Sequence, residues 1–160
     1  MMTYRICKAM ITALVASYFT LVVINNLLVP ETNLLYVSHV MSMDTLEQSN
    51  SQQWRALSAS GVHYAGFILI VLFEALAASL CWAGAWKMLF RHHFARGKAL
   101  ATLGLTLAFV IWFGFFFVVG GEWFLAWQTP WGGLNGAIRV ITVSGFALIL
   151  IHLPENQESA

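Results

Sequence analysis

The sequence predicts an all-α membrane protein: a four-helix transmembrane bundle with a short amphipathic interfacial helix in its first outer loop. Hydrophobic residues make up 59% of the 160-residue chain, and charged residues make up only 9%. A soluble domain carries roughly 25% charged residues, so this chain lacks the polar side chains that a water-facing surface needs. Four apolar windows reach the length of about 20 residues with which a helix crosses a hydrocarbon core of roughly 30 Å. The net charge of +1 argues against a nucleic-acid partner.

The four windows are each expected to be helical, because lipid offers no partner to an unpaired backbone N–H or C=O group. The first ends before Pro30, which cannot continue a helix that needs its N–H. Its length, and the lack of a small-x-small cleavage site, indicate a retained anchor instead of a signal peptide. The predicted spans cover residues 9–29, 62–89, 99–119 and 134–153, in a single membrane domain (1–153) followed by a polar tail (154–160).

The orientation is predicted from the basic residues, which collect on the cytoplasmic side of membrane proteins. Six of the eight Lys and Arg residues flank the predicted spans on the side of the two termini, and only Arg55 and Arg139 lie on the other side. We therefore expect both termini to be cytoplasmic. The six residues are Arg5, Lys8, Lys87, Arg91, Arg96 and Lys98.

The first outer segment, from Pro30 to Gly61, carries its own pattern. Apolar residues recur there at helical spacing, which predicts the amphipathic interfacial helix. The stretch Gln48–Gln53 is polar and turn-like, and Trp54 begins a second short helical run toward Gly61. Tryptophans of the other outer turn favour the headgroup level. The apolar set is Leu34, Leu35, Val37, Val40 and Met41, and the tryptophans are Trp123, Trp127 and Trp131.

Glu74 is the most informative single residue, because an ionisable side chain near the middle of a span is costly and must face protein or water. It is interpreted either as a carboxyl group that carries a proton or binds a cation, or as a packing group that hydrogen-bonds a neighbouring helix. His63 lies eleven residues earlier and returns to nearly the same helix face, as does Cys81. Small residues on or near that face predict a close helix seam: Ala77, Ala78, Gly84 and Ala85.

Polar residues around the outer rim leave several interpretations open. Two histidines and two carboxylates, His39, His63, Asp44 and Glu122, could hold a divalent metal, and the two histidines could ligate a haem. No ligand spacing fixes such a geometry. The alternative is a hydrogen-bonding network, joined by Asn25 and Asn26, that pins the outer segment over the helices.

The sequence resembles the family of small bacterial integral membrane proteins called domain of unknown function 2165. The resemblance covers about Asn25 to Trp131 and, more loosely, the fourth helix. It departs at Val29-Pro30, where members often have an acidic residue, and at Trp131-Gly132-Gly133. The anchors are Asn25-Asn26-Leu27, His39-Val40-Met41-Ser42-Met43-Asp44-Thr45, Trp54-Arg55-Ala56, His63, Glu74-Ala75-Leu76, Gly120-Gly121-Glu122-Trp123-Phe124 and Trp127-Gln128.

The resemblance implies a multi-pass protein of the bacterial inner membrane with no assigned activity, so no catalytic residue is carried over. The function expected first is an accessory or interaction subunit of a larger membrane complex, with a homo-oligomer as another partner state. The alternative is a handler of a small molecule or ion (quinone, haem, metal or proton) that uses Glu74 and the rim, and an enzyme ranks below both. Structural or interface candidates are Asn25, Asn26, Trp54, Arg55, Trp123, Trp127 and Arg139.

Overall fold

The computed structural model describes residues 2–47 and 51–154, with the side chain of Leu134 left aside, and every regular element in these ranges is helical. Four helical stretches are long and apolar enough to cross a membrane, which confirms the predicted fold class. The elements are α1 (Met2–Leu28), α2 (Pro30–Ser42), η1 (Gln53–Arg55), α3 (Ser60–Met88), η2 (Arg91–His93), α4 (Phe94–Phe109), η3 (Val110–Trp123), η4 (Ala126–Gln128) and α5 (Leu134–His152).

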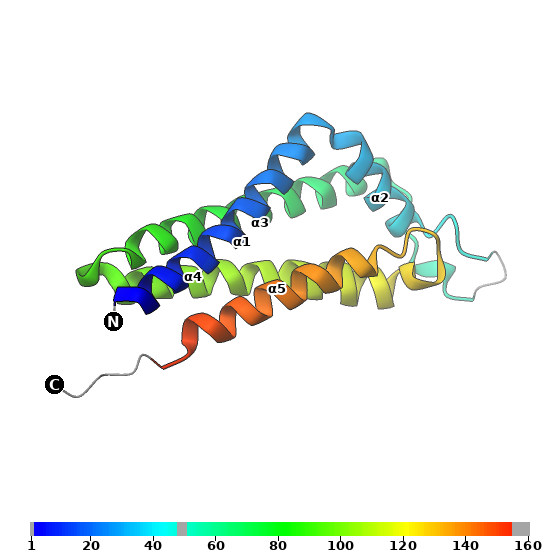
Figure 1. Cartoon of the computed structure of the whole chain (residues 1–160). Coiled ribbons are helices and arrows are strands. Elements are labelled where there is room, and N and C mark those ends of the chain that lie inside the picture. Colours follow the sequence, from blue (N-terminus) through cyan, green and yellow to red (C-terminus); the bar gives the residue numbers. More distant parts are fainter. Residues whose placement is uncertain (1, 48–50, 155–160) are drawn as a thin grey trace.

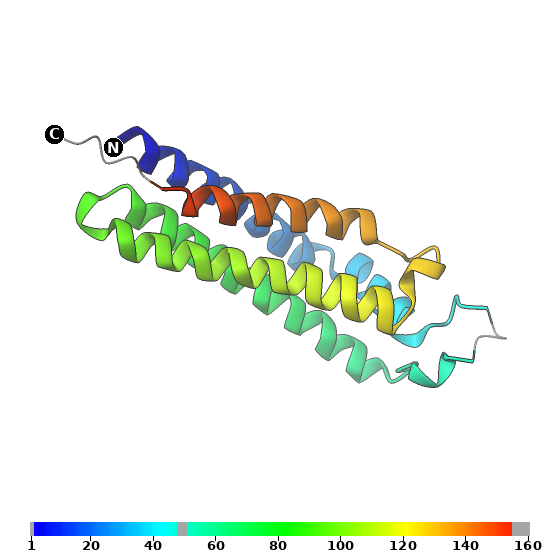
Figure 2. The same ribbon diagram turned by 90° about the horizontal axis from the view of Figure 1, so that it is seen from below.

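The long helices lie side by side, and the start of α1 and the end of α5 are at the same end of the molecule (Figures 1 and 2). We call this the terminal end, and we call the opposite end, which carries α2, the α2 end. Helix α3 packs extensively on both α1 and α4, and α5 packs on α4 and η3. By contrast, α1 and α5 meet over few residues. At the terminal end, Nζ of Lys8 donates a hydrogen bond of 2.7 Å to the carbonyl of Leu153 and so ties α1 to the end of α5.

Small residues bring α3 and α4 close together. A Cβ atom added to Gly84 would lie 2.6 Å from the backbone nitrogen of Ala101, and one added to Gly104 would lie 2.7 Å from Sγ of Cys81. In lipid, helices associate largely through such close packing, because the hydrophobic effect does not drive apolar surfaces together there. The buried small residues of this seam are Ala77, Ala78, Gly84 and Ala85 on α3, as predicted, and Gly97, Ala101, Gly104 and Ala108 on α4.

The third span changes its hydrogen-bonding pattern partway along. The α-helical part ends at Phe109, and the stretch Val110–Trp123 continues as a π-helix. In keeping with that pattern, the backbone N–H of Phe124 donates to the carbonyl of Val119, five residues earlier, over 3.0 Å. Since π-helices are rare and mostly single-turn insertions, this is an unusual segment. Together α4 and η3 run from Phe94 to Trp123, beyond both limits of the predicted span.

The first outer segment packs on the second outer turn through α2. Val40, Met43 and Leu46 are buried against Phe124 and Leu125. Helix α2 begins directly at Pro30, whose missing N–H costs nothing at a first helical position. Of the predicted apolar set, Leu35 is 51% exposed and does not belong to this contact.

One expectation for this segment is wrong. The helical run predicted from Trp54 toward Gly61 is a single 3-10 turn, Gln53–Arg55. The backbone is extended at Ala56 and again at Ala59, immediately before α3. The first residues of the polar stretch predicted as a turn, 48–50, lie outside the described residues.

Candidate functional site

Glu74 lies at the centre of a polar contact between three helices. Its side chain is 1% exposed. Nδ2 of Asn26, on α1, donates a hydrogen bond of 3.0 Å to Oε2 of Glu74, on α3. Nδ2 of Asn33, on α2, in turn donates to Oδ1 of Asn26. The chain Glu74–Asn26–Asn33 therefore joins α3, α1 and α2. The two asparagines give buried polar atoms the hydrogen-bond partners that lipid does not offer.

A small cavity adjoins this polar chain. It has a volume of about 70 Å³, and all three residues of the chain line it, together with Tyr36 and Trp112. The indole nitrogen of Trp112 is buried and makes no hydrogen bond with any residue that the structure describes. A cavity of this size has room for about two water molecules, each of which takes roughly 30 Å³ in the liquid. The carboxyl group of Glu74 therefore lies beside a space that fits about two water molecules.

His63 shares the buried face of α3 with Glu74 but does not meet it. Eleven residues of helix correspond to a separation of about 16 Å along the axis. The His63 side chain is 7% exposed, and its Nε2–H group donates to the carbonyl of Leu57 over 2.6 Å. This bond fixes the backbone that precedes α3.

His39 and Asp44 form a contact of their own at the end of α2. Nδ1 of His39 lies 2.7 Å from Oδ2 of Asp44 and 3.0 Å from Oδ1. The imidazole ring also stacks on Trp131, with ring centres 4.2 Å apart. The pair therefore helps to hold α2 against the second outer turn.

The other rim residues do not converge on one centre. Glu122 and Asn25 are exposed, unlike the buried Asn26. Among the residues that the structure describes, no three His, Cys, Asp or Glu side chains come together as metal ligands would. The polar rim is thus a set of separate contacts, and the Glu74 chain is the one that reaches into the interior.

An aromatic cluster, Trp54–Arg55–Trp123, covers part of the α2 end. The Arg55 guanidinium lies 4.8 Å from the ring centre of Trp123 and 5.6 Å from that of Trp54, which are cation–π distances. Nη1 of Arg55 also donates to the carbonyl of Trp123 over 3.3 Å. Trp54 is 72% exposed, so the cluster presents an aromatic surface; Trp127, 54% exposed, is a further tryptophan of this turn.

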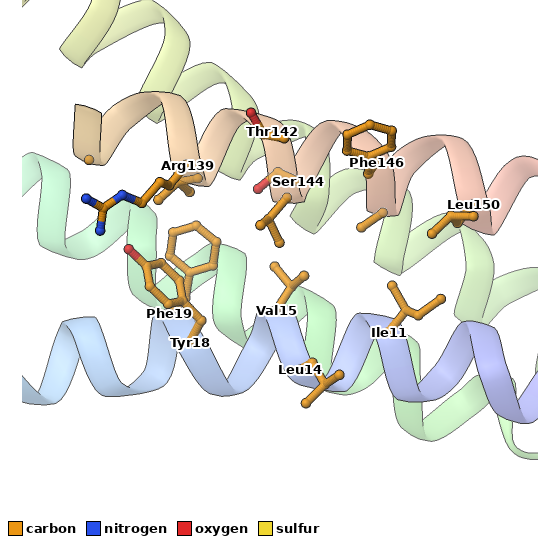
Figure 3. Close-up of a pocket in the computed structure, with 14 residues that line it drawn as sticks. Ile11, Leu14, Val15, Tyr18, Phe19, Arg139, Thr142, Ser144, Phe146 and Leu150 are labelled. Carbon is orange, nitrogen blue, oxygen red and sulfur yellow. The ribbon is translucent and has the colours of Figure 1, made fainter. Parts of the chain in front are cut away.

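An apolar groove lies between α1 and α5 (Figure 3). It has a volume of about 500 Å³ and exists because these two helices meet over few residues. In Figure 3, Ile11, Val15 and Phe19 extend from α1 into the space between the helices. The opposite wall consists largely of apolar residues of α5, among them Val140, Val143, Ala147 and Leu150.

Polar groups occur at defined places in this groove. Arg139 and Tyr18 lie together at its α2 end (Figure 3). Arg139 is exposed and makes no hydrogen bond or ion pair within the described part of the chain. Ser144, further along α5, is 0% exposed, and its Oγ atom has no hydrogen-bond partner among the described residues.

Sequence reasoning missed several members of these sites. Asn33 and Tyr36 are in an amphipathic helix whose apolar residues alone were considered, and Trp112 and Ser144 are polar-tipped residues in otherwise apolar spans. The spacing of Asn33, seven residues after Asn26, was an available signal, because it allows both amides to meet across the break at Val29. No sequence signal indicated the groove, because its presence depends on how far the first and last spans of the chain lie from each other.

The family model described as "Predicted small integral membrane protein (DUF2165)" matches residues 4–154. Comparisons with curated proteins and with solved structures give no match.

Proposed function

This chain belongs to the family of predicted small integral membrane proteins (DUF2165), and from this starting point we propose that it is a binding protein of the membrane that takes up an amphiphilic molecule from the bilayer. The groove between α1 and α5 is the proposed binding site. In this role the protein acts as a small-molecule handler and not as an enzyme.

The groove is the observation that carries the proposal. Its volume of about 500 Å³ is within the range of roughly 300 to 1,000 Å³ typical of small-molecule sites, which combine apolar walls with few polar groups. Its long axis follows two spanning helices, so an apolar tail could enter from the lipid without crossing water. Arg139, the one charged residue that lines the groove, lies with Tyr18 at one end of it. This asymmetry suits a molecule with one polar end and one apolar end.

A filled groove tests the proposal. Val143 lines the groove and is 56% exposed, so Val143→Trp should occupy the site without disturbing the core. Ile149→Trp is the matched control, because Ile149 is 60% exposed on the same helix and is not part of the lining. The delipidated protein is titrated with a phospholipid in detergent, and the thermal midpoint is followed, because a ligand of the native state raises it. The midpoint should rise for wild type and control but not for Val143→Trp. Equal rises in all three would contradict the proposal.

An accessory role in a larger membrane complex is a second candidate, which the exposed Trp54–Arg55–Trp123 cluster favours. Tryptophan and arginine are the residues most enriched at the energetic centres of protein interfaces. The experiment is purification from native membranes in a mild detergent, with Trp54→Ala as the variant and Trp86→Ala as the control, because Trp86 is 65% exposed and is not part of the cluster. A stoichiometric partner that is lost only in Trp54→Ala would support an accessory subunit. Identical, partner-free preparations would contradict it.

Proton or cation handling at Glu74 is the remaining candidate, supported by the buried carboxyl group and its adjoining cavity. Its test is the Glu74→Gln variant, because an amide preserves the shape and an acceptor oxygen but cannot release a proton. At matched protein level, loss of the cellular phenotype in a folded Gln variant would favour ion handling. A fully active Gln variant would end that interpretation.

A further inference from the structure

We propose that the occupant of the α1–α5 groove is an anionic phospholipid, with its phosphate group against Arg139 and one acyl chain along the groove. This inference rests on the proposed function and specifies the ligand. It follows from the charge at one end of the groove, from the length of the groove, and from a buried hydroxyl group in its wall.

Arg139 supplies the charge complementarity. It is the one charged residue among those that line the groove, and it has no anionic partner within the described part of the chain. An arginine in a spanning segment is costly unless it pairs or reaches the interface. It lies five residues after the first residue of α5, which is about 7.5 Å along the helix. That depth places a long, flexible guanidinium within reach of a lipid phosphate at the membrane surface.

No acidic side chain that the structure describes lines the groove beside Arg139. The carboxyl group of Glu74, buried between α1 and α3, is 1% exposed and already accepts a hydrogen bond from Asn26. Neither histidine of the α2 end, His39 or His63, lines the groove. The exposed guanidinium group of Arg139 is therefore available to a ligand from outside the described chain. Because this group is positively charged, it favours an anionic ligand.

The part of the groove beyond Arg139 matches one leaflet in length. Gly136 and Leu150 are the outermost lining residues on α5, and the stretch from Arg139 to Leu150 covers eleven residues, or about 16 Å of helix. The hydrocarbon core of a bilayer is about 30 Å thick, so one leaflet contributes about half of that. A phosphate at Arg139 would therefore leave its acyl chain running past Val143 and Ala147 toward the middle of the membrane.

Ser144 provides an independent observation. Thr12, Ser17, Thr20 and Ser79 each donate a hydrogen bond to the carbonyl four residues earlier, as hydroxyl groups in spanning helices commonly do. Ser144 has no such bond, although it is completely buried. Its hydroxyl lies five residues, or about 7.5 Å, beyond Arg139 along α5. A donor at this depth suits the ester carbonyl that connects a lipid headgroup to its acyl chain.

Native mass spectrometry of the delipidated full chain tests the inference. The probes are phosphatidylglycerol and phosphatidylcholine with the same acyl chains, at equal concentrations. Wild type should retain phosphatidylglycerol over phosphatidylcholine by about five-fold, the scale expected for one basic group near anionic lipid. Arg139→Gln should bring this ratio close to one while some of both lipids stays bound. Arg96→Gln, which removes an exposed arginine at the terminal end, should keep the wild-type ratio.

The outcomes separate this inference from the proposed function. If Val143→Trp loses lipid but the ratio does not depend on Arg139, the groove binds amphiphiles and the inference is wrong. If Val143→Trp binds both lipids as wild type does, both proposals are wrong. Two further results would overturn the inference: a neutral benzoquinone with a decyl tail that displaces phosphatidylglycerol from wild type, or a lipid-free dimer in which a second copy fills the groove. Displacement of the lipid by inorganic phosphate alone would show an anion site without an acyl-chain site, and would also overturn it.

Discussion

Glu74 contributes an acceptor to a hydrogen-bonded chain that joins three helices. The nitrogen that uses this acceptor, Nδ2 of Asn26, is on a side chain only 4% exposed. Buried donors that lose their partner keep the cost of leaving water without the compensating bond. At the scale of single residues, the stability of this three-helix junction therefore depends on the acceptor oxygen of Glu74. The charge of the carboxyl group is a different property from its ability to accept this bond.

Two substitutions of Glu74 distinguish these contributions to stability. Glu74→Gln retains an acceptor oxygen for Asn26, so its free energy of unfolding should stay close to that of wild type. Glu74→Leu should still insert into the membrane but should destabilise the protein by about 0.6 to 1.7 kcal/mol, the range measured for hydrogen bonds between spanning helices. The measurement is denaturant unfolding in mixed micelles. A Leu variant as stable as wild type would show that the chain contributes nothing to stability.

Arg139 illustrates how a residue can be noticed in a sequence without its role being visible. Its charge in an apolar span is visible in the sequence. Its proposed role, however, depends on Ser144, Tyr18 and the groove, which come together only when α1 and α5 are placed side by side. Asn26 and Glu74 are similar: their separation of 48 residues says nothing about contact until the depth and rotation of two helices are known.

The glycines of α3 and α4 act at the scale of elements, because they set the distance between two helices. In Gly84→Ala, the added Cβ would lie 2.6 Å from the backbone nitrogen of Ala101, which cannot move without shifting α4. We expect a loss of about 1 to 3 kcal/mol, as for other overpacked interiors. Gly61→Ala is the control on the same helix, since nothing lies within 4 Å of the new methyl group there. Unfolding of the two variants under the same conditions gives the comparison; equal stabilities would contradict the close seam.

The packing of α2 also has a test at this scale. Val37 and Val40 are buried, and Met43 is 1% exposed, so the backbone of this helix should resist a protease. Limited proteolysis from the α2 side should cut first within the polar stretch 48–53. Mass spectrometry of the fragments identifies the site. Early cleavage between Leu34 and Met43 would mean that the contact with Phe124 and Leu125 does not hold in the membrane.

The elements were predictable to different degrees for physical reasons. The apolar windows locate all four spans, because the length of a spanning helix is set by the bilayer. Their ends are less well located: α1 begins at Met2, since a helix can extend beyond its apolar part, and α4 begins at Phe94. Hydropathy does not distinguish bonds to the fifth residue from bonds to the fourth, so η3 was not predictable. Of the four residues of the predicted rim, His39 and Asp44 meet because they are only five residues apart, whereas His63 and Glu122 do not join them.

At the scale of the whole molecule, the topology places six basic residues at one end. The start of α1, the turn between α3 and α4, and the end of α5 are neighbours there (Figures 1 and 2). If basic residues favour the cytoplasm, a reporter fused to the C-terminus and one inserted at Ser51 should give opposite signals. A phosphatase active only outside the cytoplasm, paired with a fluorescent protein active only inside, makes this measurement. The same signal at both positions would contradict the four-span topology.

The bond between Lys8 and Leu153 also has a consequence for biosynthesis. Its two partners are 145 residues apart, so the acceptor is made long after the lysine has left the ribosome. At a synthesis rate of about 5 to 20 residues per second, the interval is roughly 7 to 30 seconds. During that time the N-terminal helix is already in the translocation machinery or the bilayer without this tie. The hydrogen bond that ties the first helix to the last can therefore form only after α5 has been made, so during synthesis α1 depends mainly on its contacts with α3.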